Sequence, residues 1–169
     1  MFGYDLQNTR YNPNEKIINV SNIFQLELAW KVETPGTINN LSSPIVANGI
    51  VYIGDNTNTI YAYDALTNKF LWNYSLEPDG FSPSVIVLNN IAYVVDHSKH
   101  LVALNAKTGV PVWTKTVPYS TNSSPTVVNN IIYIGGGNVI SAYDATSGET
   151  RWSNQNISGI VSGSPAIVN

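Results

Sequence analysis

The sequence contains no cysteine, which excludes disulfides and thiolate metal sites but leaves the cellular compartment open. Charge is scarce as well, because Asp, Glu, Lys and Arg make up 11% of the 169 residues, against about 25% in an average globular protein. The net charge is −3 and no basic cluster is present, which argues against a nucleic-acid partner. No apolar run is long enough to span a membrane. No signal peptide precedes Phe2, so any export signal is expected to lie outside these residues.

The sequence contains an eleven-residue motif, called the phrase below, that occurs three times, at 62–72, 103–113 and 142–152. The shared pattern is Ala-x-Asp-x-x-Thr-Gly-x-x-x-Trp, in which Asn105 replaces the Asp and Asn68 replaces the Gly. The first residues of successive copies, Ala62, Ala103 and Ala142, are about 40 residues apart. A fixed period of this length indicates a repeat architecture.

Each copy of the phrase predicts a β-hairpin. In the first copy Ile60 and Ala62 alternate with Tyr61 and Tyr63, as in a strand. The Asp or Asn in the third position is expected to accept hydrogen bonds from backbone amides two residues on. The Gly or Asn in the seventh position is expected to have positive φ. We expect the closing Trp to pack against the neighbouring unit, with its N–H bonded to a backbone acceptor, rather than to stack on a ligand.

Each repeat unit contains four predicted short strands. A unit begins at a Ser-Pro pair, turns at two residues such as Asn48-Gly49, returns, passes a polar loop and ends with the phrase. Four-stranded units of about 40 residues are typical of β-propeller blades. The sequence therefore predicts an all-β partial propeller of four-stranded antiparallel blades.

The expected organisation includes three whole blades with unmatched strands on either side. It comprises an irregular N-terminal segment at 1–25, an orphan outer strand at 26–33, blades at 42–77, 82–117 and 123–154, and the first strand of a fourth blade at 164–169. A propeller needs roughly 4–8 blades to close. We therefore expect a fragment of a longer protein, with open blade faces that favour self-association.

Two stretches are candidate sites. Asp96, His97 and His100 lie in the loop of the second unit, and Glu77 and Asp79 are expected on the same rim. These side chains could bind a metal ion, but a solvated polar loop would contain the same residues. We therefore expect no metal site, and keep Asp96, His97 and His100 as candidates for metal ligands. The second stretch, Gly135-Gly136-Gly137, has no following Lys or helix and is interpreted as a tight loop at 135–138, not a phosphate cradle.

The repeated phrase resembles the repeat of the pyrroloquinoline quinone (PQQ) dehydrogenase-like propellers. The stretches 2–13, 20–23 and 26–30 also resemble the N-terminal segment of quinoprotein alcohol dehydrogenases, closest to the polyvinyl-alcohol dehydrogenase type. The resemblance covers essentially the whole chain. It implies a periplasmic or extracellular enzyme that oxidises an alcohol-type small molecule or polymer with PQQ and calcium and passes electrons to a cytochrome or quinone.

The sequence also departs from that family. Many members carry adjacent cysteines near the quinone and a Gly-Gly-Ala-Glu stretch that supplies a calcium ligand. This chain has no cysteine, and its nearest match is Gly135-Gly136-Gly137-Asn138, without a carboxylate. No catalytic or cofactor-binding residue is therefore assigned, and we expect neither bound cofactor nor activity from these residues alone. The alternative is a non-catalytic propeller that serves as a scaffold for protein binding or outer-membrane assembly.

Overall fold

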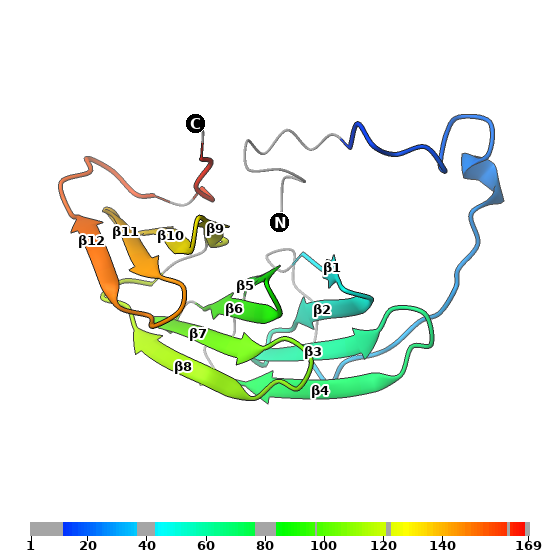
Figure 1. The fold of residues 1–169 in the computed structure, drawn as a ribbon, viewed down its shortest axis with the longest axis horizontal. Helices are drawn as coiled ribbons and strands as arrows, with labels where there is room; N and C mark the ends of the chain where they lie inside the picture. Colours follow the sequence, from blue (N-terminus) through cyan, green and yellow to red (C-terminus); the bar gives the residue numbers. More distant parts are fainter. Residues whose placement is uncertain are drawn as a thin grey trace.

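The computed structural model describes residues 12–36, 43–76, 84–96, 98–120, 123–161 and 163–167. Within these ranges the chain forms three four-stranded antiparallel sheets and one 3-10 helix, η1 (Ile23–Gln25). The sheets are arranged as a fan, with one edge strand of each sheet near the centre and the other at the outside (Figure 1). The predicted all-β partial propeller is confirmed. No helix in the described ranges has the length and apolar character needed to cross a membrane.

Each sheet is one blade, and its four strands pair in chain order. Blade 1 contains β1 (Ile45–Ala47), β2 (Ile50–Gly54), β3 (Thr59–Asp64) and β4 (Phe70–Ser75). Blade 2 contains β5 (Ser84–Leu88), β6 (Ile91–Val95), β7 (His100–Asn105) and β8 (Pro111–Thr116). Blade 3 contains β9 (Thr126–Val128), β10 (Ile131–Gly136), β11 (Val139–Asp144) and β12 (Thr150–Asn154). The inner strands are thus β1, β5 and β9, and the outer strands are β4, β8 and β12 (Figure 1).

Two-residue turns set the register of the first hairpin in every blade. The turn residues are Asn48-Gly49, Asn89-Asn90 and Asn129-Asn130, all with φ between +49° and +75°. Positive φ at both central positions is the requirement of a type I′ turn, whose twist matches that of the flanking strands. Asn and Gly tolerate this conformation better than other residues, so these pairs fix where each chain reversal occurs.

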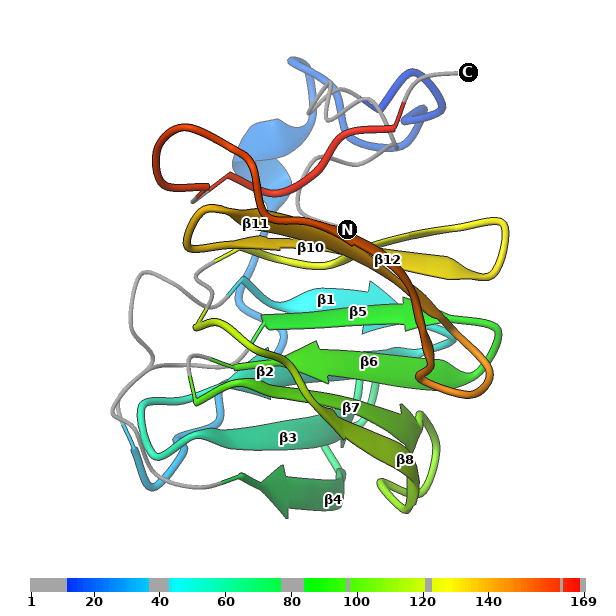
Figure 2. The same ribbon diagram turned by 90° about the vertical axis from the view of Figure 1, so that its left-hand side faces the viewer.

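The hydrophobic core lies between blades rather than within one. Strand β6 shows this clearly, because Ala92 and Val94 pack towards blade 1 while Tyr93 and Val95 pack towards blade 3. Successive side chains of a strand point to opposite faces of its sheet, so a blade between two neighbours must be apolar on both faces. Figure 2 shows the sheets stacked in this way.

Blade 1 is also buried on both faces. Tyr61 and Tyr63 are each 6% exposed, although they alternate with the apolar Ile60 and Ala62. They pack with Ile53, and Val32 from the N-terminal segment lies against this group. A Tyr ring contributes a large apolar surface and needs only its hydroxyl near a polar partner or water, so it serves as a core residue here.

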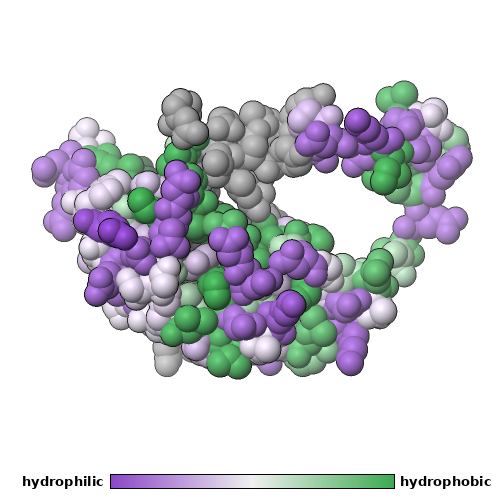
Figure 3. All heavy atoms as spheres, viewed as in Figure 1, coloured by the Kyte–Doolittle hydropathy of each residue, from purple (hydrophilic) through white to green (hydrophobic). Residues whose placement is uncertain are grey.

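The outer strands are more exposed. Every residue of β12 is exposed, and β4 and β8 are exposed at alternate positions or more. Hydrophobic side chains appear as green atoms along the lower, outer edge of the molecule in Figure 3. The exposed apolar residues of blades 1 and 2 include Leu66, Phe70, Val110 and Val112.

The two flanking segments differ from their predicted strand form. Neither 26–33 nor the described part of 164–169 is a strand, because neither has a backbone ladder with a neighbour in the described ranges. Isolated hydrogen bonds, two of which are given next, hold these segments instead. The Trp30 indole N–H donates to the Ala65 carbonyl oxygen at 2.9 Å, and the Thr126 hydroxyl donates to the Pro165 carbonyl oxygen at 2.6 Å.

The glycine stretch differs from its predicted loop. Strand β10 continues through Gly135 and Gly136, which pair with Ile140 and Val139 of β11. Only residues 137–138 remain as the turn, and Gly137 has φ of 56°. The physical reason for glycine at 135 is close packing, since a Cβ there would collide with the Val161 side chain.

Candidate functional site

The predicted metal candidates lie where β6 ends and β7 begins. The Asp96 side chain is fully buried, and its carboxylate accepts the His100 backbone N–H at 2.7 Å. The His100 Nδ1 lies 2.9 Å from the other carboxylate oxygen, which also accepts the Asn58 amide of blade 1 at 3.1 Å. Asp96 and His100 are therefore brought together, whereas His97 lies outside the described residues.

A related arrangement occurs one blade earlier, at Asp55. This carboxylate is buried and accepts hydrogen bonds from the Thr57 backbone N–H at 3.0 Å and from the Gly36 N–H at 2.9 Å. Asp55 and Asp96 both follow the second strand of a blade directly, so both act as caps of the loop that follows. Comparison of the first two units could have indicated this role, since the residue after the second strand is Asp in both, whereas the third unit has Gly137 there.

The geometry gives these carboxylates a structural role. Within the described ranges there is no group of three His, Cys, Asp or Glu side chains arranged to hold a metal ion. Glu77 and Asp79, expected on the same rim, lie outside those ranges. In the described part of the chain the Asp96 carboxylate connects blades 1 and 2 through Asn58.

The third residue of the repeated phrase caps the turn in all three blades, as predicted. One side-chain oxygen of Asp64, Asn105 and Asp144 accepts the backbone N–H groups two and three residues on, at 2.8–3.1 Å. The Thr67 hydroxyl also donates to Asp64 and lowers the pKa of that carboxyl. Arg151 pairs with Asp144 at 2.6 Å and lowers the pKa of Asp144 to about 2.

In blades 1 and 2, the Trp that closes the phrase joins its blade to the next. The Trp72 indole N–H donates to the Ala106 carbonyl oxygen at 3.0 Å, and that of Trp113 donates to the Ala145 carbonyl oxygen at 3.2 Å. The rings lie on the glycines of the next phrase, because a Cβ on Gly109 or Gly148 would lie under 3 Å from ring carbons. These glycines have φ of 71° and 73°, as the sequence predicts.

Trp152, at the same position in blade 3, has no such acceptor in the described ranges and is 47% exposed. Its ring contacts Tyr133 of its own blade, with ring centroids 6.2 Å apart. Trp30, which precedes blade 1, bonds to the Ala65 carbonyl and so occupies the equivalent place on that blade. Trp30 therefore covers the face of blade 1 that points away from blade 2, whereas Trp152 finds no following blade in the described ranges.

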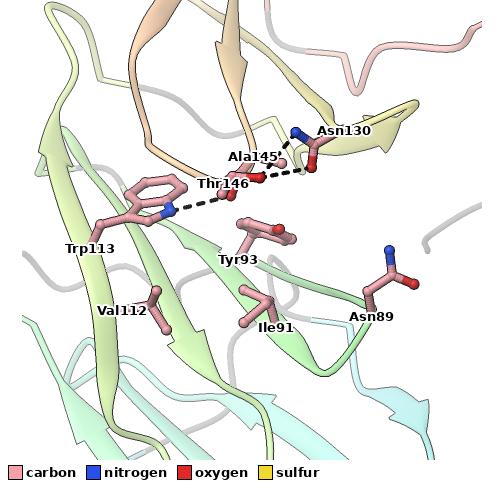
Figure 4. Close-up of a pocket in the computed structure, with 8 residues that line it drawn as sticks. All are labelled: Asn89, Ile91, Tyr93, Val112, Trp113, Asn130, Ala145 and Thr146. Atoms are coloured by element: carbon pink, nitrogen blue, oxygen red, sulfur yellow. Dashed lines mark hydrogen bonds between the residues drawn. The ribbon is translucent and has the colours of Figure 1, made fainter.

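A groove of about 300 Å³ lies between blades 2 and 3, beside Trp113. Figure 4 shows Ile91, Tyr93, Val112 and Trp113 around it, with three polar side chains at its edge. The polar residues are Asn89, Asn130 and Thr146. Sequence reasoning missed this site, because its residues come from turns and strands of two different units.

Two protein families match the chain, one in each half. The family described as "Glucose/ethanol/alcohol dehydrogenase, beta-propeller domain" matches residues 1–85. The family described as "Outer membrane protein assembly factor BamB" matches residues 80–168. Each match covers at least half of the chain, and both families consist of propellers built from PQQ-type repeats.

Individual relatives agree with the first match. Quinoprotein alcohol dehydrogenase PedH from Pseudomonas putida is 30% identical over 179 residues, which covers 93% of this chain and 30% of the relative. The crystal structure of quinohemoprotein alcohol dehydrogenase from Comamonas testosteroni has a TM-score of 0.79 and 27% identity, over 90% of this chain and 26% of that chain. This chain thus spans about 30% or less of the length of these relatives.

BamB from Moraxella catarrhalis shares the fold, with a TM-score of 0.56 and 21% identity over 63% of this chain and 34% of that chain. The two family matches, the sheet topology and the Trp contacts between blades all agree. The chain belongs to the PQQ-type β-propeller family.

Proposed function

We propose that these residues form the first blades of the propeller of an exported, PQQ-dependent alcohol dehydrogenase. The observation that carries the proposal is the match of residues 1–85 to the dehydrogenase propeller family. The N-terminal segment supports it, because its Trp30 covers blade 1 as a preceding outer strand would. The substrate is an alcohol-type small molecule or polymer, and the electrons pass to a cytochrome or a quinone.

Under the same proposal, the 169-residue chain has no alcohol dehydrogenase activity in isolation. A site on the axis of a propeller needs inner strands from many blades, and here β1, β5 and β9 surround only part of that axis (Figure 1). The described residues offer no set of three metal-ligating side chains, so they do not by themselves fit a calcium-quinone centre. A longer protein would supply those residues, in the periplasm or outside the cell.

The test compares the 169-residue chain with the protein made from the longer open reading frame. Both are incubated with PQQ and calcium chloride, and alcohol-dependent dye reduction is measured with small alcohols and with polyvinyl alcohol. The longer protein should reduce the dye only when PQQ is present, and the shorter chain should not. A longer protein that never binds PQQ would contradict the proposal.

The alternative function is a non-catalytic scaffold for protein binding or outer-membrane assembly. The BamB family match at residues 80–168 favours it, as does the exposed Trp152 on the open side of blade 3. The longer reading frame separates the two: a quinone-stacking Trp and a catalytic Asp in later blades favour the enzyme. A longer protein without them, with a lipid-attachment cysteine before Met1, favours the scaffold.

Under either function, we propose that the open side of blade 3, which is the face that points away from blade 2, drives self-association of the isolated chain. Light scattering after size-exclusion chromatography, over a tenfold range of concentration, should show a mass that rises with concentration. The variant Trp152→Glu should lower that mass, because a charged residue there opposes burial of the strand. A concentration-independent monomer would show that three blades are stable with one side uncovered.

A further inference from the structure

The groove between blades 2 and 3 is more open than the corresponding junction between blades 1 and 2. Ile50 and Trp72 at the first junction are 8% and 6% exposed. Their counterparts Ile91 and Trp113 at the second junction are only partly buried. The two junctions have the same repeat positions and the same Trp-to-carbonyl bond, so the difference must come from a few side chains.

Hydrogen bonds between the blades, including one across the solvent-exposed opening (the mouth) of the junction, account for this difference in exposure. At the first junction the Asn48 amide donates to the Asn90 side-chain oxygen at 3.2 Å, and the Tyr52 hydroxyl donates to the Ala106 carbonyl at 3.1 Å. These bonds close the junction from blade to blade.

At the second junction the residue in the place of Asn90 is Asn130, which bonds within its own blade. Its amide donates to the Thr146 hydroxyl at 3.1 Å, and that hydroxyl lies 3.2 Å from the Asn130 side-chain oxygen (Figure 4). The first junction has Lys107 in the place of Thr146. Among the described residues the Asn89 side chain consequently has no hydrogen-bond partner across the mouth, and the groove stays open.

The lining of the groove restricts what it can bind. The floor consists of two aromatic rings and two aliphatic side chains, and the edge carries the amides of Asn89 and Asn130 and the hydroxyl of Thr146. None of the lining residues is charged, so a charged ligand would lose its hydration without gaining a counter-charge. A neutral ring with an apolar face and hydroxyl groups at its edge matches both parts, through contact with the partly exposed Trp113 ring and hydrogen bonds to the amides.

We propose that the groove between blades 2 and 3 binds a sugar ring, with its C–H face against Trp113 and Val112 and its hydroxyls bonded to Asn89 and Asn130. The volume of about 300 Å³ is at the lower end of the range for small-molecule pockets and suits one ring. This site lies between two blades, beside the outer strand β8 of blade 2, and does not depend on the proposed dehydrogenase function. The sugar is either a free monosaccharide or the terminal unit of a glycan.

The test is a titration followed by nuclear magnetic resonance, with glucose and maltohexaose as the two probes. The indole N–H signal of Trp113 should shift, while that of Trp72 stays in place and serves as an internal reference. Stronger binding of maltohexaose would indicate a glycan end, and equal binding would indicate a single free sugar. No shift at Trp113 with either probe would overturn the proposal.

Two variants and a matched control distinguish a loss of sugar binding at this groove from a general effect on the fold. Asn89→Ala should weaken binding about tenfold, because it removes one hydrogen bond to the ligand. Thr146→Lys should also weaken it, because it copies Lys107 and frees Asn130 to close the mouth. The control Asn48→Ala, at the equivalent place in blade 1, should leave binding unchanged. Equal affinities in Asn89→Ala, Thr146→Lys and the parent protein would contradict the assignment.

Discussion

At the residue scale, the repeated phrase works through hydrogen bonds that each copy makes in the same way. The acidic or amide side chain in its third position receives two backbone N–H groups in every blade. An Asn serves as well as an Asp for this purpose, as Asn105 shows. The charge on Asp144 therefore adds something beyond the cap, namely the ion pair with Arg151.

The Asp144 pair predicts a specific loss of stability in acid. Arg151 lowers the pKa of Asp144 from its ordinary value of 3.8 to about 2 in the folded protein. The stabilisation is present above about pH 4 and is lost as the pH falls through 2, because the unfolded chain binds a proton first. Urea unfolding of Asp144→Asn between pH 2 and 5 should show a shallower fall in unfolding free energy than the parent. Equal slopes would show that the pair contributes nothing.

Gly109 predicts a second effect, which combines backbone strain with crowding. Ala at this position would have an unfavourable φ of 71° and a Cβ about 2.7 Å from ring carbons of Trp72. Gly49 offers a matched control, since it has φ of 75° but nothing within 4 Å of a Cβ. Gly49→Ala should cost about 1–2 kcal/mol of unfolding free energy. Gly109→Ala should cost a further 1–3 kcal/mol or so, from overpacking. Equal costs in denaturant unfolding would show that the ring moves away freely.

At the element scale, each blade has a regular β-bulge where its third strand meets its fourth. The register shifts between Ala62 and Tyr63 in blade 1, between Ala103 and Leu104 in blade 2, and between Ala142 and Tyr143 in blade 3. A bulge increases the local twist of a strand. The same shift in every blade therefore gives the closing Trp the same position relative to its sheet, so that it can reach the next blade.

The outer strands predict unequal contributions from their Trp residues. Trp72 is 6% exposed and bonded to blade 2, so Trp72→Ala should cost about 3–5 kcal/mol of unfolding free energy. Trp152 is 47% exposed and lies on the open side, so Trp152→Ala should cost roughly 1 kcal/mol or less. Chemical denaturation of the monomeric species measures both. Similar costs in the monomer would contradict this prediction, because they would show that Trp152 is packed within its own chain.

Much of this element structure follows from the sequence alone, because turns and repeats leave strong local signals. The pairs Asn48-Gly49 and Asn129-Asn130 indicate where the hairpins reverse, and the structure has positive φ at each. The continuation of β10 through Gly135 and Gly136 could not be predicted, because glycine has a low preference for strands. Gly135 is required here by the side chain of Val161, which is distant in sequence. The groove could not be predicted either, since it depends on whether Asn130 bonds to Thr146 or across the junction.

At the scale of the whole molecule, two functions share one architecture. The N-terminal half matches a dehydrogenase family and the C-terminal half matches an assembly-factor family. Both families consist of propellers built from PQQ-type repeats, so the fold alone does not choose between them. In the described ranges the buried carboxylates of Asp55 and Asp96 cap loops and link neighbouring segments, so they do not favour either function.

Because the hydrophobic core lies between blades, the protein should lose its structure from the ends inward. Blade 2 has a packed neighbour on both faces, whereas among the described residues blade 3 packs against another blade on one face alone. In such an array each unit is stabilised mainly by its neighbours, and the end units open first. Amide hydrogen exchange should therefore be slowest in β6 and β7 and fastest in β12, a gradient set by position in the stack rather than by the sequence of each blade.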